Sequence, residues 1–214
     1  MLRPRNYKVT GMSNLLTVDR LIVNQKAKLI EVTQEYAIRN ENGDQVGYIR
    51  QEGQTFLHKA ARFITSIDQF LTHHFALYDD AGTKILELSR PAKIFKSRIL
   101  VRGGNGQQLG QIVQKNVFGK IRFDLEAAGG QPVGQIRAEN WRAWNFAIVD
   151  ENEREIARIT KKFVGVAKAL FTPADNYIVD IDRAVEGQKR LFVLASATAV
   201  DTALKQDSRG IDFT

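Results

Sequence analysis

Several residue types and signals are missing from this 214-residue chain. It has no cysteine, which excludes disulfides, thiol catalysis and cysteine-ligated metal sites. Its four prolines form no proline-rich stretch, so no linker of that kind divides the chain. The first residues are polar and lack the apolar core of a secretory signal, and neither a myristoylation pattern nor a prenylation box is present. These absences favour a single-domain cytoplasmic protein.

The usual motifs of enzymes are missing as well. There are three histidines, and two of them, His73 and His74, are adjacent, so on a strand they would face opposite sides and could not share a metal. No Gly-x-Ser-x-Gly elbow occurs. Residues 104–110 resemble a nucleotide-binding loop, but strand-like alternation follows them instead of a helix, which favours a hairpin turn. The sequence therefore predicts a protein that is not an enzyme and requires no cofactor.

Long apolar runs are also scarce, and the longest is the ten-residue block 191–200. It is apolar nearly all round and contains no helix breaker, so we predict a helix over about residues 187–205. Ten helical residues cover only about 15 Å, whereas a membrane span needs about 20 apolar residues. The helix is therefore expected to be buried in protein, and no transmembrane span is predicted.

Turn chemistry recurs upstream of this block. Asn, Asp and Gly cluster at residues 40–43, 79–82, 103–106, 127–130 and 150–153, as tight hairpins require. Similar return strands follow at 46–50, 109–113 and 133–137, and apolar and polar residues alternate over 119–126 and 177–181. Eight to twelve such half-buried strands before one apolar helix predict a closed antiparallel barrel around that helix. We assign residues 15–206 to this barrel, between a flexible segment 1–14 and a tail 207–214.

Several segments resemble the phospholipid scramblases and, with them, the Tubby-like and LURP-one-related proteins. The resemblance runs from about residue 15 to 204 and rests on residues 23–31, 79–82, 86–91, 159–165 and 169–177, followed by the apolar helix that closes with Val200 and Asp201. It implies a mainly β fold, in which a 12-stranded barrel encloses a C-terminal hydrophobic helix. It also implies a non-enzymatic, membrane-associated protein.

The family's proposed calcium segment precedes the central helix. By this resemblance, the candidate ligands are Asp175, Asn176, Asp180 and Asp182, with Glu186 as a further oxygen donor. The chain departs from the pattern because Pro173 stands where the first acid is expected. The alternation around Tyr177 instead favours a solvated strand face, with Asp182 capping the coming helix. The sequence favours this second interpretation and leaves calcium as an alternative.

A net charge of +7 favours association with polyanions. The cations Arg90, Lys93, Lys96, Arg98 and Arg102 fall within thirteen positions. Lys161, Lys162 and Lys168 form a second group, and Lys59 with Arg62 a third. On one rim of the barrel, the first group could hold phosphates of anionic lipid. The resemblance to Tubby-like proteins, which bind phosphoinositide on a basic surface, implies the same role. The alternative is a solvated surface that keeps the domain soluble. Aromatic residues are not concentrated among the cations, which disfavours nucleic acid as the partner.

The sequence thus predicts a scramblase-like peripheral binder of anionic membrane lipid with weak or no lipid translocation. The main alternative is a LURP-one-like interaction scaffold or regulator that acts through a protein partner. A third class, a barrel that carries a small apolar ligand, would require a cavity beside the helix.

Overall fold

The computed structural model describes residues 14–25, 35–52, 72–91, 98–116, 119–140, 145–162 and 176–207. A short 3-10 helix, η1 (Asn14–Leu16), comes first. The strands that follow are β1 (Arg20–Gln25), β2 (Glu35–Arg39), β3 (Gln45–Glu52), β4 (His73–Asp79), β5 (Lys84–Arg90), β6 (Arg98–Gly103), β7 (Gln108–Gln114), β8 (Arg122–Ala127), β9 (Pro132–Ala138), β10 (Asn145–Asp150), β11 (Glu155–Lys162) and β12 (Asn176–Ile181). The helix α2 (Gly187–Asp207) closes the described chain.

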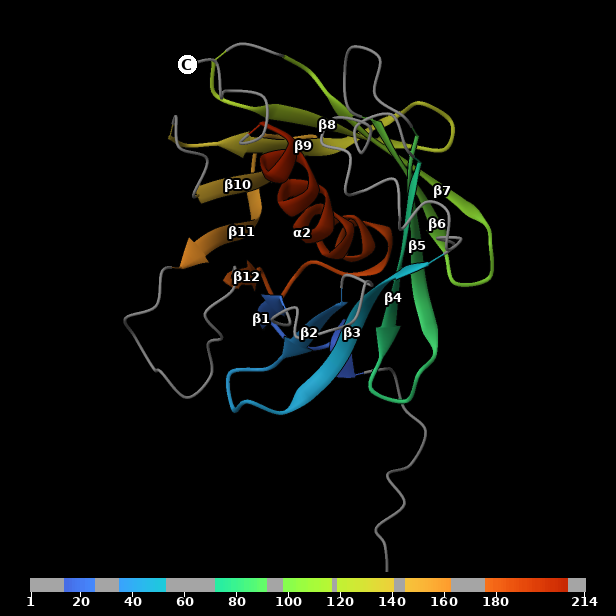
Figure 1. Cartoon of the computed structure of the whole chain (residues 1–214). Helices are drawn as coiled ribbons and strands as arrows, with labels where there is room; N and C mark the ends of the chain where they lie inside the picture. Colours follow the sequence, from blue (N-terminus) through green and yellow to red (C-terminus); the bar gives the residue numbers. More distant parts are fainter. Residues whose placement is uncertain are drawn as a thin grey trace, which may run out of the picture.

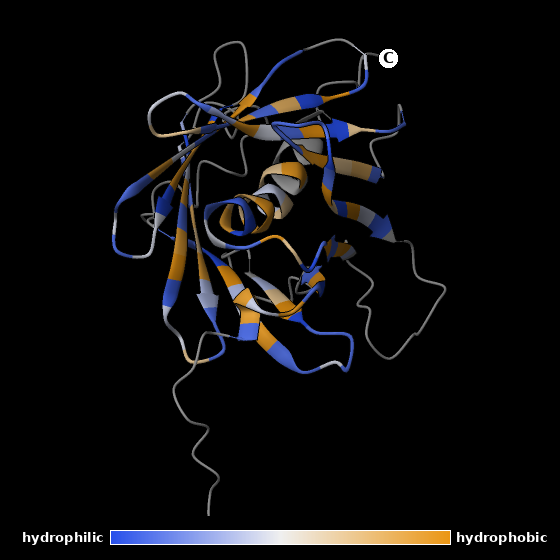
Figure 2. Ribbon diagram, turned by 180° about the vertical axis from the view of Figure 1, so that it is seen from behind, coloured by the Kyte–Doolittle hydropathy of each residue, from blue (hydrophilic) through white to orange (hydrophobic). Residues whose placement is uncertain are grey.

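The twelve described strands form one closed antiparallel barrel. Each strand pairs with its neighbours in sequence, and β1 pairs with β12 to complete the ring. The sheet surrounds α2 (Figure 1). Apolar and polar residues alternate along many strands (Figure 2), and the inward side chains form one core with the helix. The predicted barrel around a helix is confirmed.

The helix is buried along its apolar block. Residues 192–200 are all buried, including Ser196, whose hydroxyl donates to the Phe192 carbonyl at 2.7 Å. Within the block 191–200, only Leu191 is partly exposed. A helix apolar on all sides is stable in water only when other protein covers it, and here the strands provide that cover.

The five hairpins at one end of the barrel share one turn geometry. In each, the fourth residue of the predicted cluster has a left-handed conformation: Gly43, Gly82, Gly106, Gly130 and Glu153. In three of them, the first residue is an Asn or Asp whose side chain accepts the backbone N–H four positions later, at 2.7–3.0 Å. This is a three-residue loop with a left-handed residue that forms a bulge, a common hairpin connection. The turn chemistry in the sequence predicted all five.

The barrel therefore has two distinct ends. We call the end with the five hairpins and the β12–α2 connection the turn rim. The opposite end, where β6 and β8 begin and β7 ends, is the loop rim. Because α2 follows the end of β12, it begins at the turn rim and runs toward the loop rim. This arrangement decides which charged residues can act together.

Arg190 fastens the start of α2 to the wall of the barrel. Its side chain is 6% exposed, and its Nη atoms donate to the carbonyls of Val185 at 3.2 Å and Val18 at 2.5 Å. Burial lowers the pKa of Arg190, while the Asp19 carboxylate, 3.7 Å away, opposes that shift. The guanidinium thus ties the segment before β1 and the β12–α2 connection to the helix.

Removing this side chain should destabilise the fold. We expect Arg190→Ala to lower the free energy of unfolding by about 2 kcal/mol, because two backbone carbonyls lose a charged donor. Urea unfolding followed by circular dichroism measures the change. Arg183→Ala, at a side chain that is 91% exposed, is the matched control and should change the value by less than about 0.5 kcal/mol. Equal effects of the two substitutions would contradict the role given to Arg190.

Candidate functional site

Arg90 does not belong to a basic surface, and this part of the sequence interpretation is corrected. The residue is 4% exposed and shares the inward face of β5 with Leu86 and Leu88. It lies opposite His73, which is buried on the inward face of β4. The alternation of the strand places Arg90 inside the barrel, where it cannot contact a membrane surface.

The other cations fall in different places. Lys93 and Lys96 lie outside the described residues, and so does the side chain of Lys162. Lys161 is partly buried, and its Nζ lies 5.8 Å from the ring centroid of the buried Tyr177. A lysine held against an inward-facing tyrosine is a poor headgroup contact.

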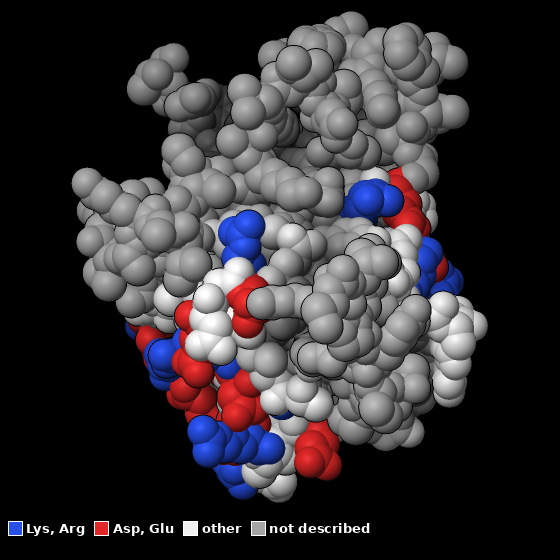
Figure 3. Space-filling view, turned by 90° about the horizontal axis from the view of Figure 1, so that it is seen from below, with Lys and Arg blue, Asp and Glu red and all other residues white. Residues whose placement is uncertain are grey.

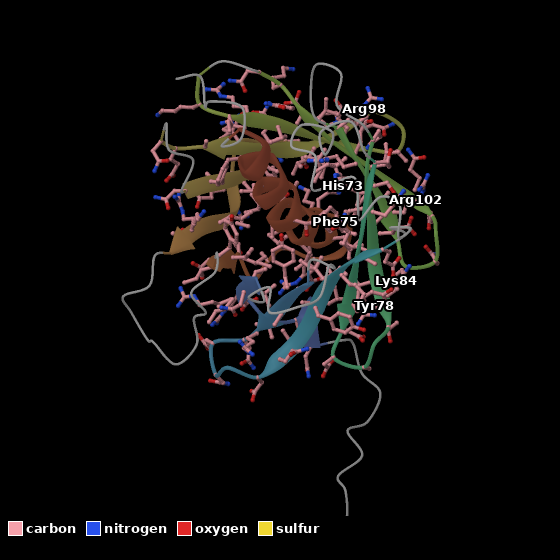
Figure 4. The ribbon with its side chains drawn as sticks, in the orientation of Figure 1. His73, Phe75, Tyr78, Lys84, Arg98 and Arg102 are labelled. Atoms are coloured by element: carbon pink, nitrogen blue, oxygen red, sulfur yellow. The ribbon has the colours of Figure 1, made fainter. Side chains whose placement is uncertain are left out.

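Arg98 and Arg102 lie on the same outward face of β6 but at opposite ends of the strand. Arg98 is exposed at the loop rim. Arg102 is near the turn rim, 3.9 Å from Glu87 (Figure 4). The two were predicted to share one rim with Arg90, and the structure separates all three. Among the described members of that group, only Arg98 remains an exposed cation at the loop rim.

Three further cations join Arg98 there. Lys115 follows the end of β7, while Lys120 and Arg122 lie just before and at the start of β8, and all are exposed. Arg98 pairs with Val113 on β7, and the Lys115 N–H donates to the Arg122 carbonyl at 2.8 Å. Arg98, Lys115 and Arg122 thus extend outward from three adjacent strands. We call Arg98, Lys115, Lys120 and Arg122 the basic surface.

Asn116 shapes the connection that carries most of this surface. Its side-chain Nδ2 donates to the Lys120 carbonyl and its Oδ1 accepts from the Arg122 N–H, both at 2.9 Å. Lys115 pairs with Asp124 at 2.9 Å, which raises the pKa of Lys115. The sequence analysis missed Lys115, Lys120 and Arg122, which join Arg98 only through the pairing of β6, β7 and β8. The Asn-x-x-x-Lys-x-Arg spacing was the only signal that could have found them.

The described connections at the two ends of the barrel differ in charge. At the turn rim, the connections carry seven acidic and two basic residues: Glu41, Asp44, Asp80, Glu151, Glu153, Asp182 and Glu186, with Arg154 and Arg183. At the loop rim, the described parts of the connections carry Lys115, Lys120 and Glu139, and Arg98 and Arg122 begin the adjoining strands. Among the described connections, an excess of acidic residues therefore occurs at the turn rim and not at the loop rim.

Acidic and basic side chains lie next to each other on the face seen from below in Figure 3. Several of the acids at the turn rim are paired. Arg20 meets Asp180 at 2.5 Å, Arg183 meets Asp19 at 3.1 Å, and Lys189 meets Glu151 at 2.8 Å. The cations at this rim are thus largely neutralised by local partners, unlike Arg98, Lys120 and Arg122.

The candidate calcium ligands are dispersed. Asp175 lies outside the described residues and the side chain of Asn176 is not described. Asp180 is paired with Arg20, Asp182 meets Arg154 at 2.7 Å, and Glu186 is exposed. Within the described ranges, no three His, Asp or Glu side chains are grouped as metal ligands.

Asp182 does not cap α2, so that part of the prediction is wrong. Its Oδ1 accepts the Ala184 N–H at 2.8 Å, and the helix begins only at Gly187. The Ala184 N–H and then Arg154 hold the pKa of Asp182 below its usual range. The short turn that Asp182 closes, in which Val185 N–H donates to its carbonyl, separates it from the helix. The predicted solvated strand face agrees with β12, where Tyr177, Val179 and Ile181 are buried and the residues between them are partly exposed.

The model of one protein family, Scramblase, matches residues 2–204 of this chain. The chain belongs to the Scramblase family. Among curated proteins, this scramblase-family chain is 26% identical over 183 residues to a phospholipid scramblase family protein of Schizosaccharomyces pombe. That alignment covers 77% of the chain and 46% of the yeast protein, so the chain spans about half the length of this relative.

The fold of this scramblase-family chain resembles that of a protein from Arabidopsis thaliana known from an X-ray structure. The TM-score is 0.51 at 10% sequence identity, and the match covers 90% of the chain and 98% of the plant protein. At this identity the likeness concerns the fold, and it agrees with the Tubby-like barrel that the sequence predicted. Among the described residues, no helix is long and apolar enough to cross a membrane.

Proposed function

We propose that this scramblase-family barrel binds anionic phospholipid surfaces peripherally, through the basic surface at the loop rim, and moves lipid weakly or not at all. The observation that carries the proposal is that the described connections of the turn rim are mainly acidic, whereas the exposed cations of the basic surface lie at the loop rim. Arg98, Lys120 and Arg122 are exposed at the loop rim, and no ion pair of theirs occurs among the described residues. These side chains can approach lipid phosphates without first breaking a salt bridge.

Electrostatics should also orient the barrel. Each Lys or Arg near an anionic surface contributes about 1 kcal/mol, and the attraction falls off within a Debye length. The acidic connections of the turn rim are repelled by the same surface. The barrel is therefore expected to bind with the loop rim toward the membrane and the turn rim away from it.

The environment of α2 supports weak or absent translocation. A translocation path must satisfy a polar headgroup within hydrocarbon, where an unpaired polar group costs several kcal/mol. Residues 192–200 are buried against the strands, so the apolar helix is not available to line such a path. We also propose that lipid binding needs no calcium, because Asp180 and Asp182 are each paired with an arginine.

Co-sedimentation with liposomes tests this proposal. Binding to vesicles that contain phosphatidylserine should exceed binding to neutral vesicles at least about tenfold, and it should weaken strongly when ionic strength rises from about 0.05 to 0.3 M. Calcium and a calcium chelator should give the same binding. Equal binding to neutral and anionic vesicles would contradict the proposal. Isolation of a stoichiometric protein partner, together with no vesicle binding, would favour an interaction scaffold instead.

A further inference from the structure

A neutral side chain, Asn116, joins the end of β7 to the residues that lead into β8. Its Nδ2 donates to the Lys120 carbonyl and its Oδ1 accepts the Arg122 N–H, both at 2.9 Å. Its own carbonyl accepts from the Nε2 of Gln114, a side chain that is 5% exposed, at 3.0 Å. Asn116 therefore connects a buried side chain of the barrel with the two residues that carry exposed cations.

Backbone hydrogen bonds hold the same segment from the neighbouring strands. The Ile121 carbonyl accepts the Ala138 N–H at 2.9 Å, and the Lys115 N–H donates to the Arg122 carbonyl at 2.8 Å. Together with the two bonds from the asparagine amide, these contacts give each of residues 120–122 at least one bonded backbone group. The backbone of this part of the basic surface is thus fixed by the barrel itself.

The cations on this fixed backbone remain available to a ligand. Lys120 and Arg122 are exposed, and no ion pair of theirs occurs within the part of the chain that the structure describes. Fixing a loop costs conformational entropy, and a site whose backbone is already fixed does not lose that entropy on binding. The hydrogen bonds of Asn116 should therefore strengthen binding although its side chain carries no charge.

We propose that Asn116 is a positioning residue of the basic surface, which holds Lys120 and Arg122 ready to contact the phosphates of anionic lipid together. This inference rests on the proposed function, because it concerns how the same surface binds. It adds that affinity depends on the conformation of the β7–β8 connection as well as on the number of cations.

Asn116→Ala tests this role because it removes both amide contacts and changes no charge. Sedimentation with vesicles that contain phosphatidylserine, at low salt, should show an affinity about five- to tenfold lower, since the backbone of Lys120 and Arg122 must then be ordered on binding. Amide hydrogen exchange followed by NMR should show faster exchange of the Arg122 N–H, which has lost its acceptor. Thermal unfolding checks that the barrel stays folded.

A double-mutant cycle distinguishes positioning from a general loss of structure. In a chain that carries Lys120→Gln and Arg122→Gln, Asn116→Ala should change the affinity less than about 1.5-fold, because the cations that it positions are gone. A general defect of the barrel would lower the affinity equally in both backgrounds, since Arg98 and Lys115 would still attract lipid. Equal effects in the two backgrounds would overturn the proposal.

Asn40 provides the matched control at the turn rim. Its Nδ2 donates to the Asp44 carboxylate at 3.0 Å, and its Oδ1 accepts the Asp44 N–H at 2.9 Å. Asn40→Ala thus removes a comparable pair of hydrogen bonds at the end of the barrel that is expected to face away from the membrane. It should leave the affinity for vesicles unchanged, and a loss equal to that of Asn116→Ala would contradict a specific role for position 116.

Gly119→Ala perturbs the same connection without removing the amide of Asn116. Gly119 has φ +86, and a Cβ atom added there would lie 3.9 Å from Asn116 Nδ2, so alanine would strain the backbone without a clash. This variant should also weaken binding to anionic vesicles. If the unmodified chain does not prefer anionic vesicles, the proposed function fails and this inference fails with it. If the unmodified chain binds and both variants bind equally well, only the positioning role is wrong.

Discussion

Replacing Gly134 by alanine should lower the free energy of unfolding by about 3 kcal/mol or more, or prevent folding. A Cβ atom added at Gly134 would lie 2.1 Å from the carbonyl oxygen of Val149 on the paired strand β10. Because that obstacle is backbone in a closed barrel, it cannot rotate away as a flexible side chain could. The strands would have to separate, with loss of the ladder between β9 and β10.

A neighbouring glycine provides the control. Gly130, in the turn just before β9, has φ +82, and a Cβ atom added there would meet no heavy atom within 4 Å. Gly130→Ala should therefore cost only the left-handed conformation, about 1 kcal/mol. Urea unfolding of the two variants, followed by circular dichroism, gives both values. Similar losses of unfolding free energy in the two variants would contradict the prediction, because they would show that the contact with the Val149 carbonyl does not determine the effect of alanine at position 134.

Removing three cations from the basic surface should weaken binding to anionic vesicles about 100-fold. The variant is Arg98→Gln, Lys120→Gln and Arg122→Gln together, and each cation near the surface is worth about 1 kcal/mol. All three side chains are exposed, so the stability of the barrel should hardly change. Liposome sedimentation at low salt measures the affinity, and thermal unfolding checks the fold.

The matched control removes the same charge elsewhere. Arg20→Gln, Arg154→Gln and Arg183→Gln change exposed residues that lie at the turn rim. If binding depended only on net charge, both triple variants would lose affinity equally, which would contradict an oriented surface. We expect the control to lose less than about threefold, since these cations lie farther than a Debye length from the bound membrane.

Much of the barrel could be derived from local sequence. Asn, Asp and Gly at fixed positions specified the five hairpins, because a tight turn needs a left-handed residue whatever the rest of the chain does. The glycines at positions 47, 110 and 134 recur at the same place in three return strands, which the sequence showed as a repeat. The sequence did not show why glycine is required there. In the structure, a Cβ at each would lie 1.9–2.5 Å from a carbonyl oxygen of the next strand, at Tyr78, Glu126 and Val149.

The candidate site was predicted less well, for a geometric reason. Cations close in sequence, Arg90 and Arg98, lie on opposite faces of the barrel wall, inside and outside. Cations far apart in sequence, Arg98 and Arg122, come together through the pairing of β6 with β7 and β7 with β8. Hairpin bulges shift the register, for example between Val101 and Arg102, so the face of a residue cannot be read from spacing alone.

The sequence by itself determined that antiparallel hairpins surround an apolar helix, since turns, alternation and a block of apolar residues are local properties with local physical causes. Only the tertiary structure decided which charges share a rim and which arginines are buried. Those facts depend on closure of the barrel, which sets neighbours through strand pairing between residues that are distant in the chain.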